Sequence, residues 1–207
     1  MIDPHAVTRE FEQALCDYTG AKYAVTTTSC TQAILMALAW CAQHWHTKNA
    51  AFFDEVTLPK LTYVGVPASV LNAGYGVRFV DIDWQGEYQI EPLPVWDSAR
   101  RFTSGMYRPG AMQCVSFHSS KILADTQGGA ILHDNEEADA WLRRARFDGR
   151  TEGISPKDDV ITFPNWHAYL SCDVSARLLW KLQGLPRHNV DLPRSDYGDL
   201  SLQECFK

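Results

Sequence analysis

One lysine lies in a setting that suits covalent attachment of an aldehyde cofactor. The run Val115–Lys121 (VSFHSSK) begins as an apolar strand, and residues 125–130 (DTQGGA) lead through a Gly-Gly turn into a second strand. Rigid flanks of this kind hold a lysine ready for imine formation. The strand Val95-Trp96-Asp97, which lies 24 residues upstream of the lysine, ends in a carboxylate. Pyridoxal 5′-phosphate (PLP) chemistry needs a lysine that carries the cofactor as a Schiff base and an aspartate that keeps the pyridinium nitrogen protonated. The sequence therefore predicts Lys121 and Asp97 as catalytic residues.

A phosphate site is expected at Thr28-Ser29-Cys30-Thr31, which lies between a short strand and an apolar helix. Free backbone N–H groups and the helix dipole at such a junction favour an anion, and the hydroxyls add donors. Tyr63 follows a second strand at its junction with the next helix, where its ring is placed to stack on an aromatic cofactor.

Each of these residues also has an ordinary structural interpretation. A serine or threonine before a helix is commonly just its N-cap, and a lone lysine usually lies on the surface. Core packing is the common fate of a tyrosine, and Gly128-Gly129 is a turn by default. The order and spacing of the residues, rather than any one of them, carry the prediction.

These residues need strands and helices to position them, and the apolar patterning predicts both. Helices are expected at 4–19, 32–45, 64–73, 135–147 and 169–183, and strands at 23–27, 56–58, 78–82, 95–97, 114–117 and 130–133. Residues 46–54 and 86–94 are expected to be irregular, and the tail after Pro186 a loose arm. The alternation predicts an α/β fold with a mostly parallel sheet covered by helices. We expect a core domain over 1–150, followed by a linker, a helix and the arm over 151–207.

Composition narrows the classes of protein. The 207 residues carry a net charge of −6, which argues against direct nucleic-acid binding. The Arg143, Arg144, Arg146 and Arg150 cluster is interpreted as a solvated helix end. No window approaches the ~18 apolar residues of a membrane span, and we do not expect the N-terminus to be a signal peptide. Six cysteines without CxxC spacing indicate reduced thiols and a cytoplasmic protein.

The motifs, in this order, resemble those of the DegT/DnrJ/EryC1/StrS family of PLP-dependent sugar aminotransferases, which have the fold-type-I architecture. Thr28–Ala33 resembles the family's Ser-Ser-Gly-Thr-x-Ala phosphate loop, with Cys30 where glycine is usual. Phe79–Asp83 matches Phe-Val-Asp-Ile-Asp, and Trp96–Arg100 resembles Glu-Asp-Ala-Ala-Gln/His. Ser116-Phe117-His118-x-x-Lys121 fits the Schiff-base motif. The resemblance covers about residues 7–150.

The resemblance implies a role for each matched residue. Lys121 would hold PLP and act as the proton-transfer base, and Asp97 would pair with the pyridine nitrogen. Thr31 and Ser116 would bind the phosphate, Tyr63 would cover the ring, and His167 would lie in the region that reaches the partner subunit's cofactor. Cys30 and Arg100 are the departures, in the phosphate loop and near the phenolic oxygen. No metal is expected.

Compared with family members we expect a shortened chain that largely lacks the C-terminal small domain, and only eleven residues lie between Asp83 and Val95. The resemblance implies an aminotransferase, working as a homodimer, that moves an amino group from a small amino donor such as glutamate to a keto or aldehyde group of a sugar-like substrate. Two alternatives stay open. One is a PLP-dependent decarboxylase or lyase acting on an amino-acid-like group, which a modified nucleotide could carry. The other is a degenerate, non-catalytic subunit.

Overall fold

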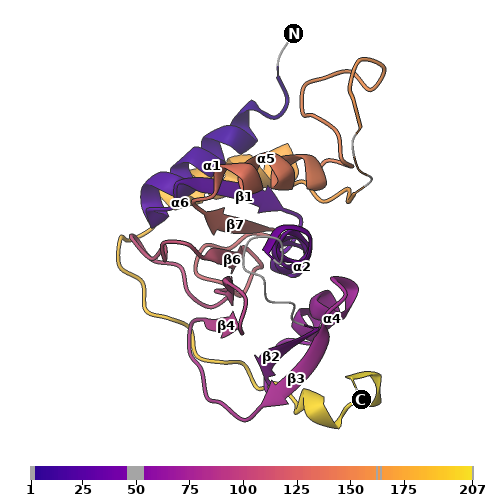
Figure 1. Ribbon diagram of the computed structural model, residues 1–207. Coiled ribbons are helices and arrows are strands. Elements are labelled where there is room, and N and C mark those ends of the chain that lie inside the picture. The colour runs from indigo at the N-terminus through magenta and orange to yellow at the C-terminus, as the bar shows by residue number, and fades with distance from the viewer. Residues whose placement is uncertain (1–2, 46–53, 162, 164, 207) are drawn as a thin grey trace.

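A five-stranded sheet forms the centre of the protein in the computed structural model (Figure 1), which describes residues 3–45, 54–161, 163 and 165–206. The strands lie in the order β1 (Tyr23–Thr27), β7 (Gly129–His133), β6 (Met112–Ser116), β5 (Val95–Asp97) and β4 (Tyr88–Ile90). Strands β1, β6 and β5 run in one direction, and β7 and β4 run against them. The α/β class is thus as expected.

The expectation of a mostly parallel sheet needs correction at β7 and β4. The loop from β6 to β7 contains no helix, and only four residues separate β4 from β5. Short connections of this kind return the chain antiparallel, whereas a parallel neighbour needs a longer crossover. The sequence interpretation also missed β4 itself, because it assigned residues 86–94 to a loop. Tyr88 and Ile90 are buried there, and β4 pairs with β5 along its whole length.

Helices cover both faces of the sheet. Val25, Cys114 and Ile131 point into one core cluster, with α2 (Cys30–Trp40) and α5 (Glu136–Ala145). The alternate strand residues point into a second cluster, with α1 (Ala6–Thr19) and α6 (Cys172–Gln183). Side chains of a strand alternate between faces, so this division follows directly from the strand sequences. The helix α2 continues as a π-helical turn, Cys41–Trp45.

A smaller parallel pair, β2 (Glu55–Pro59) and β3 (Gly76–Val80), lies beyond β4, and α4 (Gly65–Asn72) connects its strands. The Thr57 N–H donates to the Glu91 carbonyl at 2.8 Å, which links this pair to the end of β4. The helix α4 packs against α2. Of the expected irregular segment 46–54, all but residue 54 lies outside the described residues.

The tail is not the loose arm that its prolines and glycine suggested. The C-terminal arm, residues 186–199, runs along the protein and leads to two short 3-10 helices, η2 (Leu200–Leu202) and η3 (Glu204–Phe206) (Figure 1). Backbone bonds hold it, from Ser104 to the Arg187 carbonyl at 2.8 Å and from Leu200 to the Lys60 carbonyl at 3.0 Å. Local composition indicated a loop correctly, but it carries no information about these distant partners. The division of the chain at residue 150 remains a prediction.

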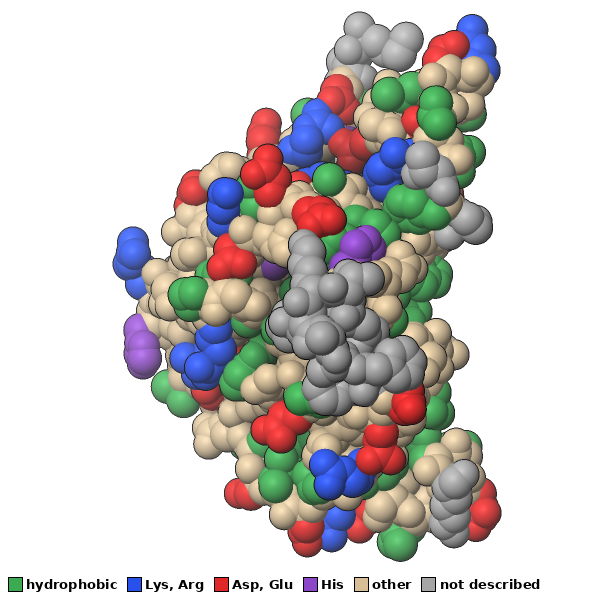
Figure 2. Space-filling view, viewed as in Figure 1, with side chains coloured by type: hydrophobic (Ala, Val, Ile, Leu, Met, Phe, Trp, Pro, Cys, Tyr) green, Lys and Arg blue, Asp and Glu red, His purple; other side chains and the backbone are tan. Residues whose placement is uncertain are grey.

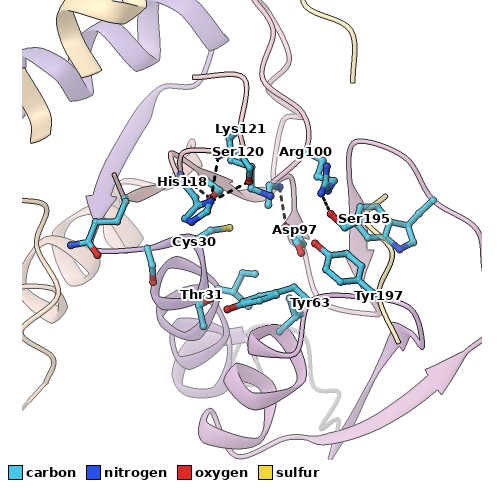
Figure 3. Close-up of a pocket in the computed structure, with 18 residues that line it drawn as sticks. Cys30, Thr31, Tyr63, Asp97, Arg100, His118, Ser120, Lys121, Ser195 and Tyr197 are labelled. Atoms are coloured by element: carbon cyan, nitrogen blue, oxygen red, sulfur yellow. Dashed lines mark hydrogen bonds between the residues drawn. The ribbon is translucent and has the colours of Figure 1, made fainter. Parts of the chain in front are cut away.

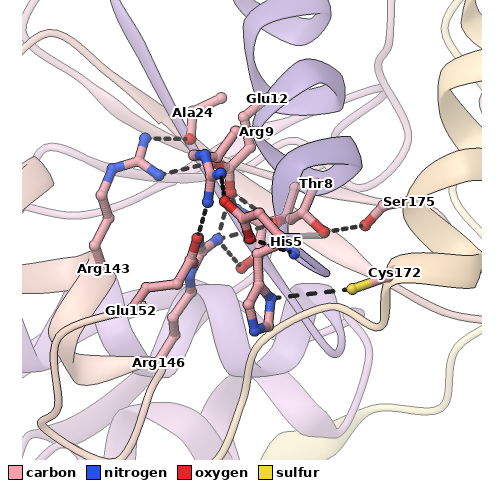
Figure 4. A network of polar contacts seen from close by, with 12 residues as sticks. His5, Thr8, Arg9, Glu12, Ala24, Arg143, Arg146, Glu152, Cys172 and Ser175 are labelled. Carbon is pink, nitrogen blue, oxygen red and sulfur yellow. Dashed lines mark hydrogen bonds and ion pairs between the residues drawn. The ribbon is translucent and has the colours of Figure 1, made fainter. Parts of the chain in front are cut away.

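The arginine cluster at the C-terminal end of α5 is not a solvated helix end (Figure 4). Arg146 is 1% exposed, and its guanidinium pairs with the buried carboxylate of Glu12 on α1. Arg143 pairs with the other Glu12 oxygen at 2.6 Å. Burial raises the pKa of Glu12, but the two guanidiniums and the Thr26 N–H outweigh it, so the pKa is lowered overall. This network joins α1, β1 and the end of α5.

No helix among the described residues is long and apolar enough to cross a membrane. On the face shown in Figure 2, acidic and basic side chains are intermixed around green apolar areas. No large single-sign surface is seen on that face.

Candidate active site

A cavity of about 320 Å³ brings together most of the residues singled out by the sequence (Figure 3). It lies where α2 and α4 begin and where β5 and β6 end. Seven of the predicted residues line it: Cys30, Thr31, Tyr63, Asp97, Arg100, Ser116 and Lys121. Ligands of α/β sheets commonly bind in such a crevice, outside the carboxyl ends of the strands.

The N-terminus of α2 forms one end of this pocket. Ser29 caps the helix, and its hydroxyl accepts a hydrogen bond from the Gln32 N–H at 3.1 Å. The first N–H groups of a helix have no acceptor within the helix, and they face outward with the positive end of the dipole. Thr31 and Ser116 place hydroxyls at the same pocket. The sequence allowed two interpretations of residues 28–31, a helix N-cap and a phosphate site. The two are compatible, because Ser29 caps the helix while other donors of the same segment face the pocket.

Cys30 lines the pocket beside the N-terminus of α2 and is buried. Its thiol is within 3.5 Å of the Cys114 carbonyl, and the residue is 9% exposed. Burial raises the pKa of the thiol well above its usual value, and the nearby Asp97 carboxylate acts in the same direction. The thiol is therefore neutral at physiological pH, and it fills space between α2 and β6.

Lys121 lies on a loop that the backbone closes tightly. The Phe117 N–H donates to the Gly128 carbonyl at 2.8 Å, and the Asp125 N–H donates to the Phe117 carbonyl at 2.7 Å. A further bond of 2.9 Å runs from the Lys121 N–H to the His118 carbonyl. These bonds fix the backbone beneath the lysine, as the sequence predicted from its rigid flanks.

Helix α6 holds the far side of the lysine loop. Arg177 and Lys181 pair with the buried Asp125 carboxylate at 2.9 and 2.7 Å. The hydrogen bond from Arg177, together with that from Lys181, keeps the pKa of Asp125 well below its usual value. The ion pairs tie the position of the lysine loop to α6.

The Gly-Gly turn at the end of this loop contacts the start of α2, where the phosphate site is expected (the phosphate end of the pocket). Gly128 has a φ of 132°, which side chains rarely adopt. A Cβ on Gly129 would lie 2.5 Å from the Cys30 nitrogen and 2.6 Å from the Ser29 carbonyl carbon. Only glycine allows this close approach of β7 to the start of α2. This contact therefore fixes the position of the lysine loop relative to the start of α2.

Asp97 ends β5 as a buried carboxylate, 4% exposed, facing the pocket. Its Oδ1 accepts from the Ala99 N–H at 2.9 Å. Burial raises the pKa of Asp97, although the Ala99 N–H, Tyr88, Lys121 and Arg100 act in the opposite direction. No ion pair of Asp97 is found among the described residues. A buried carboxylate in this state gains stability from a cationic ligand group.

Tyr63 forms part of the pocket wall just before α4. Its ring is 53% exposed and packs closely above Gly65, where a Cβ would lie 2.7 Å from Tyr63 Cε1 and 2.9 Å from Thr31 Oγ1. The exposed ring is available to a ligand and is not committed to the core.

The C-terminal arm supplies two pocket residues that the sequence interpretation missed. Ser195 and Tyr197 line the cavity, and the Tyr197 ring lies 6.5 Å from that of Tyr63. Ser195 accepts a hydrogen bond from the Arg100 guanidinium (Figure 3). No local signal marks either residue, because Ser195 contacts Arg100, 95 residues earlier in the sequence, and Tyr197 lies near Tyr63, 134 residues earlier.

His167 is the one predicted site residue that the structure does not bring to this pocket. Its imidazole is 68% exposed and lies 2.8 Å from the Asp148 carboxylate. The sequence analysis expected His167 to reach the cofactor of a partner subunit, and this role remains a prediction about a dimer.

Comparisons with known proteins identify the family of the chain and proteins of similar fold. Residues 4–107, half of the chain, match the model of the DegT/DnrJ/EryC1/StrS aminotransferase family. A UDP-4-amino-4,6-dideoxy-N-acetyl-beta-L-altrosamine transaminase of Campylobacter jejuni is 25% identical over 184 residues, covering 68% of this chain and 47% of that protein.

Solved structures of similar fold include the Helicobacter pylori PseC, an aminotransferase involved in the biosynthesis of pseudoaminic acid. It superposes with a TM-score of 0.68 at 19% identity, over 86% of this chain and 57% of that one. A GDP-4-keto-6-deoxymannose-3-dehydratase with a trapped PLP-glutamate geminal diamine has a TM-score of 0.67 at 20% identity, over 90% of this chain and 63% of that one. The chain thus spans about half of the curated relative and about three fifths of these structures.

Proposed function

The chain belongs to the DegT/DnrJ/EryC1/StrS aminotransferase family, and from this premise we propose that it is a PLP-dependent aminotransferase. The amino group would pass to a keto or aldehyde group of a sugar-like substrate, with glutamate as the amino donor. One observation carries the proposal. Lys121 and Asp97, which lie on different elements, line the same pocket as the N-terminus of α2.

The pocket residues fit PLP. The start of α2, with Thr31 and with Ser116 at the end of β6, offers donors to a phosphate. Asp97 offers a buried carboxylate without an ion-pair partner among the described residues, which suits a protonated ring nitrogen. Tyr63 offers an exposed aromatic face. When bound, PLP supplies an electron sink that stabilises negative charge on a substrate carbon.

The chain's own residues have distinct tasks in this proposal. Lys121 Nζ would hold the cofactor, and its amine would take up and release the proton that is moved during the reaction. The Asp97 carboxylate would hold a proton on the ring nitrogen. Cys30 and Arg100 would lie beside the cofactor, and Ser195 and Tyr197 of the arm line the same pocket.

A homodimer is part of the same proposal. Tyr63, which lines the pocket, and the neighbouring Val64 are 53% and 50% exposed, and such apolar surface suits a subunit contact. His167 would act toward the partner's pocket. Six unpaired cysteines support a reducing compartment, the cytoplasm. Sedimentation velocity of the chain over a range of concentrations tests the dimer.

The activity is tested with the PLP-loaded protein and a panel of amino acids and amino sugar nucleotides. We expect glutamate to yield 2-oxoglutarate, detected by mass spectrometry, and a keto sugar nucleotide to accept the nitrogen. Release of carbon dioxide or loss of a substituent without amino transfer would favour the decarboxylase or lyase alternative. A protein that retains no PLP would favour the non-catalytic subunit.

A further inference from the structure

The C-terminal arm is held on both sides of the pocket. Before the pocket, the Leu192 N–H donates to the Arg100 carbonyl at 2.9 Å, and Asp191 pairs with Arg101 at 2.8 Å. After it, Asp199 lies 3.4 Å from the Lys60 ammonium, which neighbours the start of α4. The segment 193–198 lies between these contacts, and two of its side chains, Ser195 and Tyr197, line the pocket. These two residues are therefore part of the site and not of a free tail.

Arg100 presents a guanidinium to the pocket that lacks a counter-ion among the described residues. Its one side-chain hydrogen bond in that part of the chain goes to Ser195 Oγ on the arm, and its Nε is buried with no partner. The neighbouring Arg101 differs, because it pairs with Asp191 and lies 3.6 Å from Glu87. A guanidinium carries five donors in a planar fork, so most of the capacity of Arg100 is unused.

The charges of the pocket leave Arg100 available to an anion. Asp97 is the only carboxylate among the described lining residues, and Lys121 is a second cation there. In the proposed function Asp97 serves the cofactor ring and the start of α2 serves the phosphate. Arg100 has no ion-pair partner among the described residues, and it lies where Ser195 of the arm contacts it.

We propose that Arg100, oriented by Ser195 of the C-terminal arm, binds a carboxylate of the amino substrate. The guanidinium fork matches a carboxylate in a bidentate arrangement, which fixes the orientation of the substrate as well as holding it. Arg100 is the specificity-determining residue and Ser195 a positioning residue. This inference rests on the proposed function and adds to it the residue that recognises the carboxylate of the amino donor.

The test measures binding of an unreactive dicarboxylate, glutarate, to protein whose PLP has been fixed by borohydride. Fixing the cofactor removes any influence of Arg100 on cofactor occupancy. Calorimetric titration with glutarate is expected to show an affinity lower by about tenfold or more in Arg100→Gln, with partial retention in Arg100→Lys. Ser195→Ala is expected to weaken glutarate about threefold, and Ser195→Thr to restore it. Arg78→Gln, which removes a charge from an exposed side chain on β3, is the control and should match the wild type.

The neutral diamide glutaramide separates charge recognition from general packing, because its affinity should not change in Arg100→Gln. Equal glutarate affinity in the wild type, Arg100→Gln and Arg100→Lys would overturn the inference, and the proposed function would stand if PLP is fixed on Lys121. If no PLP is fixed, the proposed function fails. The same titration on protein without PLP then tests Arg100 by itself, with the same pair of outcomes.

Discussion

Replacing Gly129 by alanine is expected to damage both stability and cofactor binding. The added Cβ would lie 2.5 Å from the Cys30 nitrogen, where ordinary contact begins at 3.4 Å, so the two backbones would have to separate by about 0.9 Å. Gly129 pairs with Thr27 on one side and Ser116 on the other, so β7 has little freedom to move away. The first residues of α2 would therefore have to move away from β7.

The magnitude follows from this overlap with backbone. Overpacking of a tight interior costs about 1–3 kcal/mol, and no flexible side chain is present here to absorb it. The displacement also moves the N–H groups at the start of α2, so PLP affinity should fall about tenfold. Urea unfolding and PLP titration by absorbance measure the two effects.

Gly184→Ala is the matched control, because its nearest neighbour is the Lys181 carbonyl at 3.8 Å. It should leave both quantities nearly unchanged. If Gly129→Ala unfolds at the same urea concentration as Gly184→Ala and binds PLP equally well, the contact between the Gly-Gly turn and the phosphate end does not exist as described.

Three further predictions concern charged groups. Glu12→Gln removes the carboxylate from the buried guanidinium of Arg146, and urea unfolding should show a loss of about 3–5 kcal/mol. Asp125→Asn should cost about 1–3 kcal/mol, because its partners Arg177 and Lys181 are partly exposed. The pKa of Asp125 in the folded protein lies below its ordinary 3.8. The contribution of Asp125 to the free energy of unfolding is therefore complete above pH 3.8 and is lost as the pH falls further. Between about pH 5 and about pH 2.5, the wild type should lose more unfolding free energy than Asp125→Asn. Asp97→Asn should keep PLP attached but slow formation of keto acid from glutamate by about 100-fold or more.

Each of these has a contradicting result. Unchanged unfolding of Glu12→Gln would mean that the buried network carries no stability. Parallel acid profiles of the wild type and Asp125→Asn would show that Asp125 is not paired in the folded protein. A fully active Asp97→Asn would remove the aspartate from the proposed chemistry.

The sequence predicted the parts of the site that are local in the chain. One short stretch contains Ser116, Lys121 and the Gly-Gly turn. Its apolar runs and glycines predict a strand, a loop and a second strand. Thr31 follows a strand and begins a helix, and Asp97 ends a strand. Because the ends of neighbouring strands meet at one sheet edge, these segments converge in the fold.

The remaining features depend on contacts that local patterning does not contain. Strand β4 is three residues long and is stabilised by its pairing with β5, so it gave no periodic signal. The C-terminal arm has the composition of a loop, and only its distant partners place Ser195 and Tyr197 in the pocket. Arg146 looked solvated beside other arginines, but its partner Glu12 lies 134 residues away.

The most direct test of the account is whether Lys121 attaches PLP. Purified wild type and Lys121→Ala would be mixed with PLP, their visible absorbance recorded, and the products treated with borohydride and mapped by peptide mass spectrometry. We predict a visible band in the wild type that borohydride converts into a stable PLP modification on the Lys121 peptide, and neither in the variant. Failure of the wild type to retain PLP, or equal modification of Lys121→Ala at other lysines, would contradict the central claim.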